Sequence, residues 1–166
     1  VLRRSPQYVQ ARMSRAGHVG EFEIQVTKTI GLDRDGGTAL EIEYELENLP
    51  RDLPIHFGVE FNFAGMAAGA PDRYFYDSRG QQLGQLQTVQ DLPPTERLGL
   101  IDEWLGLDVS LELSHPGGFW TFPIETISQS EGGFEGVHQS TVVIPHWQFT
   151  TADGKWSVRI LLSADT

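Results

Sequence analysis

Cysteine is absent from this sequence of 166 residues. Its absence excludes a disulfide scaffold, a thiolate zinc site and a cysteine nucleophile. Long apolar runs are also missing, because none approaches the roughly 20 residues that a membrane-spanning helix needs. No signal-peptide pattern opens the chain. We therefore expect no membrane association and a cytoplasmic location. Because the sequence begins with Val1 rather than methionine, we also expect it to be a piece of a longer polypeptide.

Basic residues are scarce, and they are unevenly distributed. The chain carries 12 Lys and Arg against 23 Asp and Glu, a formal net charge of -11. Residues 1–19 nevertheless contain four arginines and no acid, so the remaining chain is more acidic than the total suggests. An acidic surface repels phosphate backbones, so nucleic acid is not an expected partner.

Helical periodicity is missing too, and strict alternation of apolar and polar residues takes its place. In "TALEIEYELEN", four glutamates alternate with Leu40, Ile42, Tyr44 and Leu46. This pattern is typical of a strand with one buried and one solvated face. "GEFEIQVTKTI" alternates in the same way, and the Asp- and Gly-rich turn between the two predicts a hairpin. Similar short runs with turn signals between them predict an all-β fold, a large antiparallel two-sheet β-sandwich with little helix, forming one domain over residues 1–166.

Several finer expectations concern individual strands. Residues 7–14 are expected to form a first strand, with Arg12 and Arg15 across from Glu21 and Glu23. "HPGG" at 115–118 is expected to be a turn. Trp120 and Trp156 lie in phase with apolar neighbours, so both are expected in the core, whereas Trp104 and Trp147 are left open.

Motifs for metals, cofactors and nucleophiles are not found. No two of the five histidines are four residues apart, the helical spacing of a zinc protease. His138 and His146 would lie about 26 Å apart on a straight strand, too far to share an ion. "DRDGG" at 33–37 lacks the acid of a calcium loop at position 12, so a hairpin turn is favoured. We expect no metal and no cofactor.

Two stretches supply candidate binding residues. In "IHFGVEFNF", the polar side chains of His56, Glu60 and Asn62 oppose a strongly apolar face, which suits sugar hydroxyls, a domain interface or an ordinary surface. "SEGGFEGVHQSTVVIPHW" predicts a loop at 130–136 and a strand at 137–144 that ends at a proline. The candidates of this second stretch are Glu131, His138, His146 and Trp147.

Four segments together carry a resemblance to a known family: "FGVEFNFAG" at 57–65, "DEWLG" at 102–106, "ETISQSEGGFEGVHQS" at 125–140 and "PHW" at 145–147. Over roughly residues 20–163 the chain resembles the C-terminal β-sandwich of family-57 glycoside hydrolases, the α-amylases and 4-α-glucanotransferases. The resemblance implies a galactose-mutarotase-like fold. It also implies that catalysis belongs to an N-terminal (β/α) barrel, so no catalytic residue transfers to this chain.

The resemblance favours a non-catalytic accessory domain, a C-terminal piece of a longer α-glucan-acting enzyme. Its expected partners are the N-terminal catalytic domain of the same polypeptide and an α-glucan or oligosaccharide. Two alternatives stay open: an independent carbohydrate-binding module, and a mutarotase-like epimerase that uses a His and a Glu as acid and base. For the epimerase, the nearest pair is His56 with Glu60, which strand geometry places about 13 Å apart.

Overall fold

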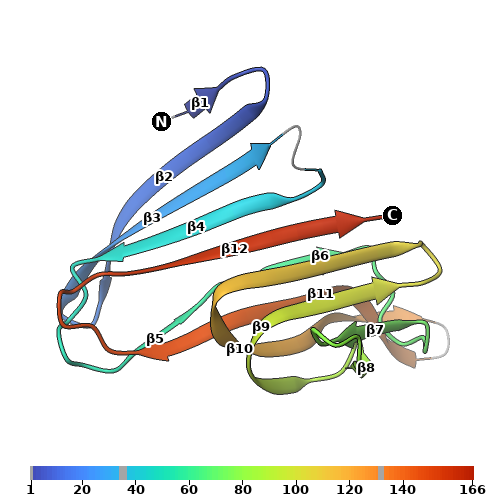
Figure 1. The fold of residues 1–166 in the computed structure, drawn as a ribbon. Helices are drawn as coiled ribbons and strands as arrows, with labels where there is room; N and C mark the ends of the chain where they lie inside the picture. Colours follow the sequence, from blue (N-terminus) through green and yellow to red (C-terminus); the bar gives the residue numbers. More distant parts are fainter. Residues whose placement is uncertain (1, 34–36, 131–132) are drawn as a thin grey trace.

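The computed structural model describes residues 2–33, 37–130 and 133–166, and within them it contains strands and no helix. Figure 1 shows how these strands are arranged. The strands are β1 (Leu2–Arg4), β2 (Tyr8–Val19), β3 (Phe22–Asp33), β4 (Leu40–Glu47), β5 (Ile55–Gly58), β6 (Phe61–Ala64), β7 (Arg73–Tyr76), β8 (Gln82–Gln85), β9 (Gln90–Asp102), β10 (Leu107–Ser130), β11 (Gly133–Phe149) and β12 (Trp156–Asp165). In the described part of the chain, no helix is long and apolar enough to cross a membrane.

Antiparallel hydrogen bonds join the strands in the order β1-β2-β3-β4-β12-β10-β9-β7-β8, and β11 pairs with β10, β5 and β6. Strand β10 connects the two layers of the fold (Figure 1). It pairs with β12 over Asp108–Leu113 and with β11 over Gly118–Ser130. The layers meet face to face, since the Tyr44 ring of β4 lies 5.7 Å from the Phe57 ring of β5, a strand with which β4 shares no hydrogen bonds. The expected all-β sandwich is confirmed.

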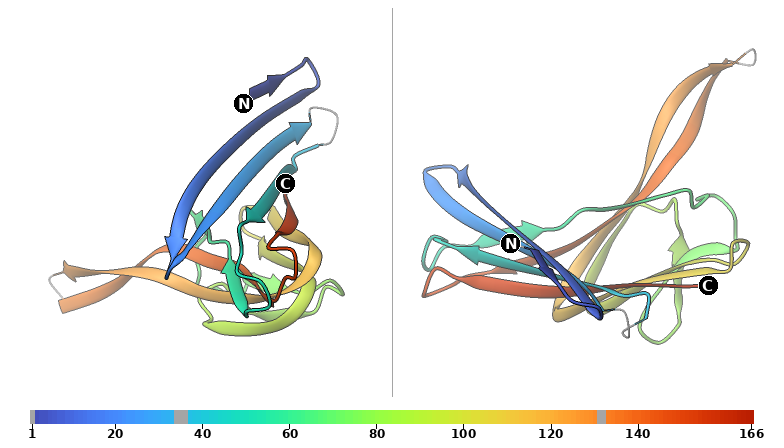
Figure 2. Two further views of the ribbon diagram at one scale, coloured as in Figure 1. Left: turned by 90° about the vertical axis from the view of Figure 1, so that its left-hand side faces the viewer. Right: turned by 90° about the horizontal axis from the view of Figure 1, so that it is seen from above.

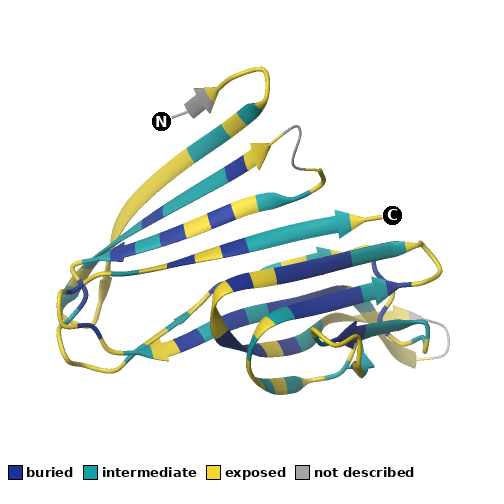
Figure 3. Cartoon of the chain, in the orientation of Figure 1, coloured by how far each residue is buried: buried dark blue, intermediate teal, exposed yellow. Residues whose placement is uncertain are grey.

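The alternation in the sequence places the core. Ile42, Tyr44 and Leu46 are buried, while Glu41 and Glu43, which alternate with apolar residues along the strand, are exposed. The same banding runs along β12, and Figure 3 shows buried residues concentrated where the layers overlap. Because the two strands pair through Ile42 and Ile160, their apolar residues line one continuous face.

The strand expected at residues 7–14 exists as β2, but it is the second strand and its partners differ from those expected. It runs from Tyr8 to Val19, further than expected, and pairs along its whole length with β3. Arg15 lies opposite Val26, and Arg12 bonds Glu45 at 2.9 Å across the outer face. The expected pairing of the two arginines with Glu21 and Glu23 is therefore wrong, because the hairpin turn falls at Gly20 and shifts the register.

Two expected interruptions do not occur. Residues 115–118 continue β10 instead of turning, with register shifts against β9 between Glu112 and Phe119. Strand β11 passes through Pro145 without ending. The carbonyl of Pro145 accepts a hydrogen bond from the Val59 amide, so its missing N–H faces the gap between β5 and β6.

Beyond residue 124, β10 and β11 leave the body as a two-stranded arm (Figure 2). The arm replaces most of the expected loop at 130–136, because Gly133 already belongs to β11. Ile127 and Phe134 on it are 79% and 78% exposed. Glu131, one of the candidate binding residues, lies outside the described residues.

Candidate functional site

Two candidate histidines, 90 positions apart in the chain, meet on the outward face of the sheet. Strand β5 pairs with the end of β11 so that His56 lies opposite Gln148 and Gly58 opposite His146. This register puts both histidine side chains on one face. Nε2 of His56 lies 3.1 Å from Nδ1 of His146, so one ring donates a hydrogen bond and the other accepts it.

Trp120 of β10 completes this cluster. Its indole stacks on the His146 ring with 4.2 Å between centroids and 29° between planes, and it receives the edge of the His56 ring at 5.2 Å. The side chain is 37% exposed, so the expectation that Trp120 lies in the core is wrong. We call His56, Trp120 and His146 the Trp–His patch.

A glycine makes room for the patch. Gly118 lies opposite His146 in the ladder, and a Cβ at this glycine would stand 2.7 Å from Nε2 of His146. Any larger residue at 118 would push the ring away from the strand. The position of the His146 ring against β10, and with it the stack on Trp120, therefore depends on the absence of a side chain at residue 118.

The electrostatics of the patch favour uncharged imidazole. Burial lowers the pKa of His146 from its ordinary value of 6.5, and the neighbouring His56 lowers it further. The carboxylate of Asp91, 3.9 Å from Nε2, acts in the opposite direction. At neutral pH His146 is therefore neutral. Its Nε2 is buried and has no hydrogen-bond partner among the described residues.

A hollow of about 480 Å³ adjoins the patch on the side of Nε2. It is lined by Pro93 and Pro94 of β9 and by Gly117 and Gly118 of β10. Asp91 reaches it with a side chain that is 78% exposed. The hollow lies where the register of β9 against β10 shifts, which opens space between two strands that are otherwise close.

The other candidates fall elsewhere. Glu60 and Asn62 share the exposed face of His56, but they bond each other at 2.7 Å and not the histidines. Trp147 is 5% exposed and belongs to the core, where its Nε1 donates to the carbonyl of His115 at 3.1 Å. His138 lies on the arm, and both its ring nitrogens are buried without a partner in the described part of the chain.

The arrangement provides an aromatic surface, an imidazole nitrogen and a carboxylate. It has the features of a binding site, with a few polar groups beside an apolar platform. Among the described residues no group of three or more His, Asp or Glu side chains is placed to hold a metal ion. The sequence interpretation found both histidines but missed Trp120, Asp91 and Gly118. The paired glycines at 117–118, taken as a turn, were the available signal.

Known proteins are similar to this chain in sequence and in fold. The family model described as "Alpha-amylase/4-alpha-glucanotransferase, C-terminal" matches residues 3–160. "Alpha-amylase 1" of Dictyoglomus thermophilum is 27% identical over 113 residues, 63% of this chain and 15% of that protein. "Alpha-amylase" of Pyrococcus horikoshii is 29% identical over 128 residues, 77% of this chain and 16% of that protein. The chain thus spans about a sixth of the length of these curated relatives.

Solved structures show the same fold. The 4-alpha-glucanotransferase of Thermococcus litoralis aligns with a TM-score of 0.66 at 19% identity, covering 98% of this chain and 22% of that one. A GalM/aldose epimerase homologue from C. elegans aligns with a TM-score of 0.54 at 12% identity, covering 99% of this chain and 68% of that one. Since the family model spans nearly the whole sequence, the chain belongs to the family of alpha-amylase/4-alpha-glucanotransferase C-terminal domains.

Proposed function

We propose that this chain is a single-domain, non-catalytic accessory module of an α-glucan-acting hydrolase or glucanotransferase, and that its Trp–His patch binds the glucan. The observation that carries the glucan contact is the exposed Trp120 indole, held on His146 beside the hollow that Asp91 lines. Membership of the C-terminal domain family supports the accessory role. Assignment to glycoside hydrolase family 57 and the cytoplasmic location stay predictions.

The chemistry of a pyranose suits this patch. One side of a glucose ring is lined by C–H groups that pack on the face of an indole, which is apolar and carries partial negative charge. The hydroxyls at the ring edge then lie within reach of groups that accept hydrogen bonds. Asp91 lines the hollow with a side chain that is 78% exposed, and its carboxylate can accept such a bond.

The first test is calorimetric titration of the 166-residue chain with maltoheptaose, followed in parallel by tryptophan fluorescence. We expect binding with a fluorescence shift. Trp120→Ala should weaken it at least about tenfold, because a stacking contact of 1.4 kcal/mol or more is lost. Trp104→Ala is the matched control, since Trp104 is 79% exposed but not part of the patch. Equal affinity of Trp120→Ala and Trp104→Ala for maltoheptaose would show that the patch does not bind the glucan.

An independent carbohydrate-binding module would use the same patch. It differs in retaining full affinity when separated from the rest of an enzyme. Titration of the same maltoheptaose into the longer polypeptide separates the two: tighter binding there indicates a shared site, and equal binding indicates an independent module.

A mutarotase-like epimerase has less support, because Glu60 bonds Asn62 and not His56. The likeness to the epimerase homologue shows the fold alone. Polarimetry on freshly dissolved α-glucose tests it, and we expect no acceleration over buffer.

A further inference from the structure

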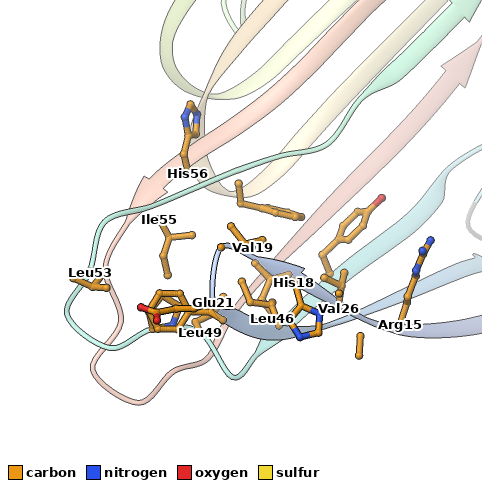
Figure 4. A pocket seen from close by; sticks show the side chains of 18 of the residues that line it. Arg15, His18, Val19, Glu21, Val26, Leu46, Leu49, Leu53, Ile55 and His56 are labelled. Atoms are coloured by element: carbon orange, nitrogen blue, oxygen red, sulfur yellow. The ribbon is translucent and has the colours of Figure 1, made fainter.

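An apolar groove of about 920 Å³ lies under the β2–β3 hairpin, and of the Trp–His patch only His56 lines it (Figure 4). One wall is the inner face of the hairpin, and the other is the segment at 49–57 that leads into β5. Leu46 near the end of β4 and Leu49 at the start of that segment also line the groove, and they are 3% and 5% exposed. In Figure 4 the His56 ring stands away from the other side chains that line the groove.

The groove exists because the two layers do not match in extent. Pairing of β2 with β3 places Val19 opposite Phe22 and Arg15 opposite Val26. These residues lie on the inner face of the sheet, the face that covers the core where the two layers overlap. The opposing layer does not reach this end of the hairpin, so the apolar row stays uncovered. Val19 is 65% exposed, Met13 50% and Leu53 46%. Contiguous apolar surface of this kind marks a contact site for a protein, a membrane or a ligand.

The charge at the groove restricts what fits it. The residues that line it include Arg15, His18 and Lys28 but only one acid, Glu21. The chain as a whole has a formal net charge of -11, so this is a locally basic site on an acidic molecule. A second copy seated groove to groove would bring two basic rims together, which is unfavourable. The charge instead suits a partner whose apolar contact residues are ringed by carboxylates.

The length of the relatives indicates which partner this is. The matched region covers 15% and 16% of the two amylases, so more than four fifths of each polypeptide lies outside it. The matching family is a C-terminal domain family, so in its members the other parts of the enzyme are covalently attached neighbours at high effective concentration.

We propose that the groove binds the catalytic part of the same polypeptide. That part inserts apolar side chains between the β2–β3 hairpin and segment 49–57 and places carboxylates next to Arg15 and Lys28. This inference rests on the accessory role proposed above, and it adds the surface and the chemistry of the contact. The two surfaces share His56, whose ring stands away from the other lining side chains, while Trp120 and His146 do not line the groove and remain open to glucan.

The absence of cysteine makes a direct test possible. Val19→Cys introduces one thiol in the groove, and Val89→Cys is its matched control, since Val89 is 75% exposed and does not line the groove. Each variant is labelled with a maleimide, once in the 166-residue chain and once in the longer polypeptide with its other thiols replaced by serine. We expect the rate at residue 19 to fall at least about tenfold in the longer polypeptide, since reaction then needs local opening. The rate at residue 89 should not change.

A second groove position protects the test against a local disturbance. Leu53→Cys lies on the opposite wall and should be slowed together with Val19→Cys. Equal rates at residue 19 in the two contexts would overturn the proposal. So would slowing in the 166-residue chain as its concentration rises, because the occupant would then be a second copy.

The maltoheptaose titration keeps this inference separate from the proposed function. Thiol protection without sugar binding would support the groove and count against the patch. Sugar binding that depends on Trp120, without thiol protection, would support the patch and overturn the groove.

Discussion

Trp147 and Trp120 lie on opposite faces of the same antiparallel strand pair, and they have opposite environments. Trp147 of β11 is 5% exposed, packs on Phe57 and Trp156, and has its N–H bonded. Trp120 of β10 is 37% exposed, stacks on His146 and makes an edge contact with His56. The same residue type thus supports the core on one face and lies in the proposed binding patch on the other. The face of the sheet, and not the residue, decides the role.

The adjacent residues Gly117 and Gly118 also serve opposite faces of the sheet. A Cβ at Gly117 would stand 2.7 Å from Nε1 of Trp147, and one at Gly118 would stand 2.7 Å from Nε2 of His146. Each glycine therefore makes room for the ring on its own face. Substitutions at these four positions should separate stability from binding.

The largest effect is expected from Trp147→Ala. Loss of a buried indole and the cavity it leaves should lower the free energy of unfolding by about 3–5 kcal/mol. Urea denaturation followed by circular dichroism measures the change. Trp147→Phe, which keeps an aromatic ring in place, should cost clearly less. A loss below that of Trp120→Ala would contradict the assignment of Trp147 to the core.

Next in size is Gly117→Ala. The buried indole beside it cannot move away, so overpacking should cost about 1–3 kcal/mol of stability. Gly118→Ala meets the His146 ring, which lies on the outward face of the sheet and not in the core, and it should cost less. Its main effect should be weaker maltoheptaose binding, since His146 is displaced. The comparison fails if both variants lose stability equally and neither loses affinity.

Trp120→Ala should have a smaller effect on folding than either core change. The side chain is partly solvated already, so we expect a loss of about 1–2 kcal/mol from reduced burial and the lost ring stack. The same denaturation experiment measures it. A loss as large as that of Trp147→Ala would mean that the outer face is also covered.

The smallest effect concerns pH. The pKa of His146 in the folded chain is lowered, so the folded state takes up this proton less readily than the unfolded state. The stability associated with this residue is fully present above about pH 6.5, and it is lost as pH falls below that value through the lower folded pKa. Asp91 and His56 face the ring, and their charges modify the transition. In His146→Gln the decline in stability between pH 7 and 5 should be shallower, measured against the parent chain.

The sequence predicted the strands whose two faces differ in polarity. Along β4, glutamates alternate with apolar residues, so period-two alternation identified both the strand and its buried side. In "GGFWTFPI" both faces carry apolar residues, because Phe119 is fully buried on one side and Trp120 packs on histidine on the other. Alternation cannot tell these faces apart, and Trp120 was assigned to the wrong one.

The Trp–His patch depends on long-range pairing. His56 reaches His146 only because β5 joins β11 in one particular register, and nothing local to either residue determines that register. Pro145 was expected to end its strand. It is tolerated because the ladder on that side is already broken between β5 and β6, which no local pattern reveals.

The outer edge of β2 has a further consequence for how the chain behaves among other chains. Of the described residues, only β1 pairs with this edge, at Val9–Ala11, so the backbone from Arg12 to Val19 offers its hydrogen bonds outward. Exposed strand edges of this kind invite strand addition and aggregation. Here the edge carries Arg12 and Arg15 and no acid, so two copies that approach edge to edge repel each other. Repulsion between like charges therefore opposes self-association at this edge, but a strand that carries carboxylates can still pair with it.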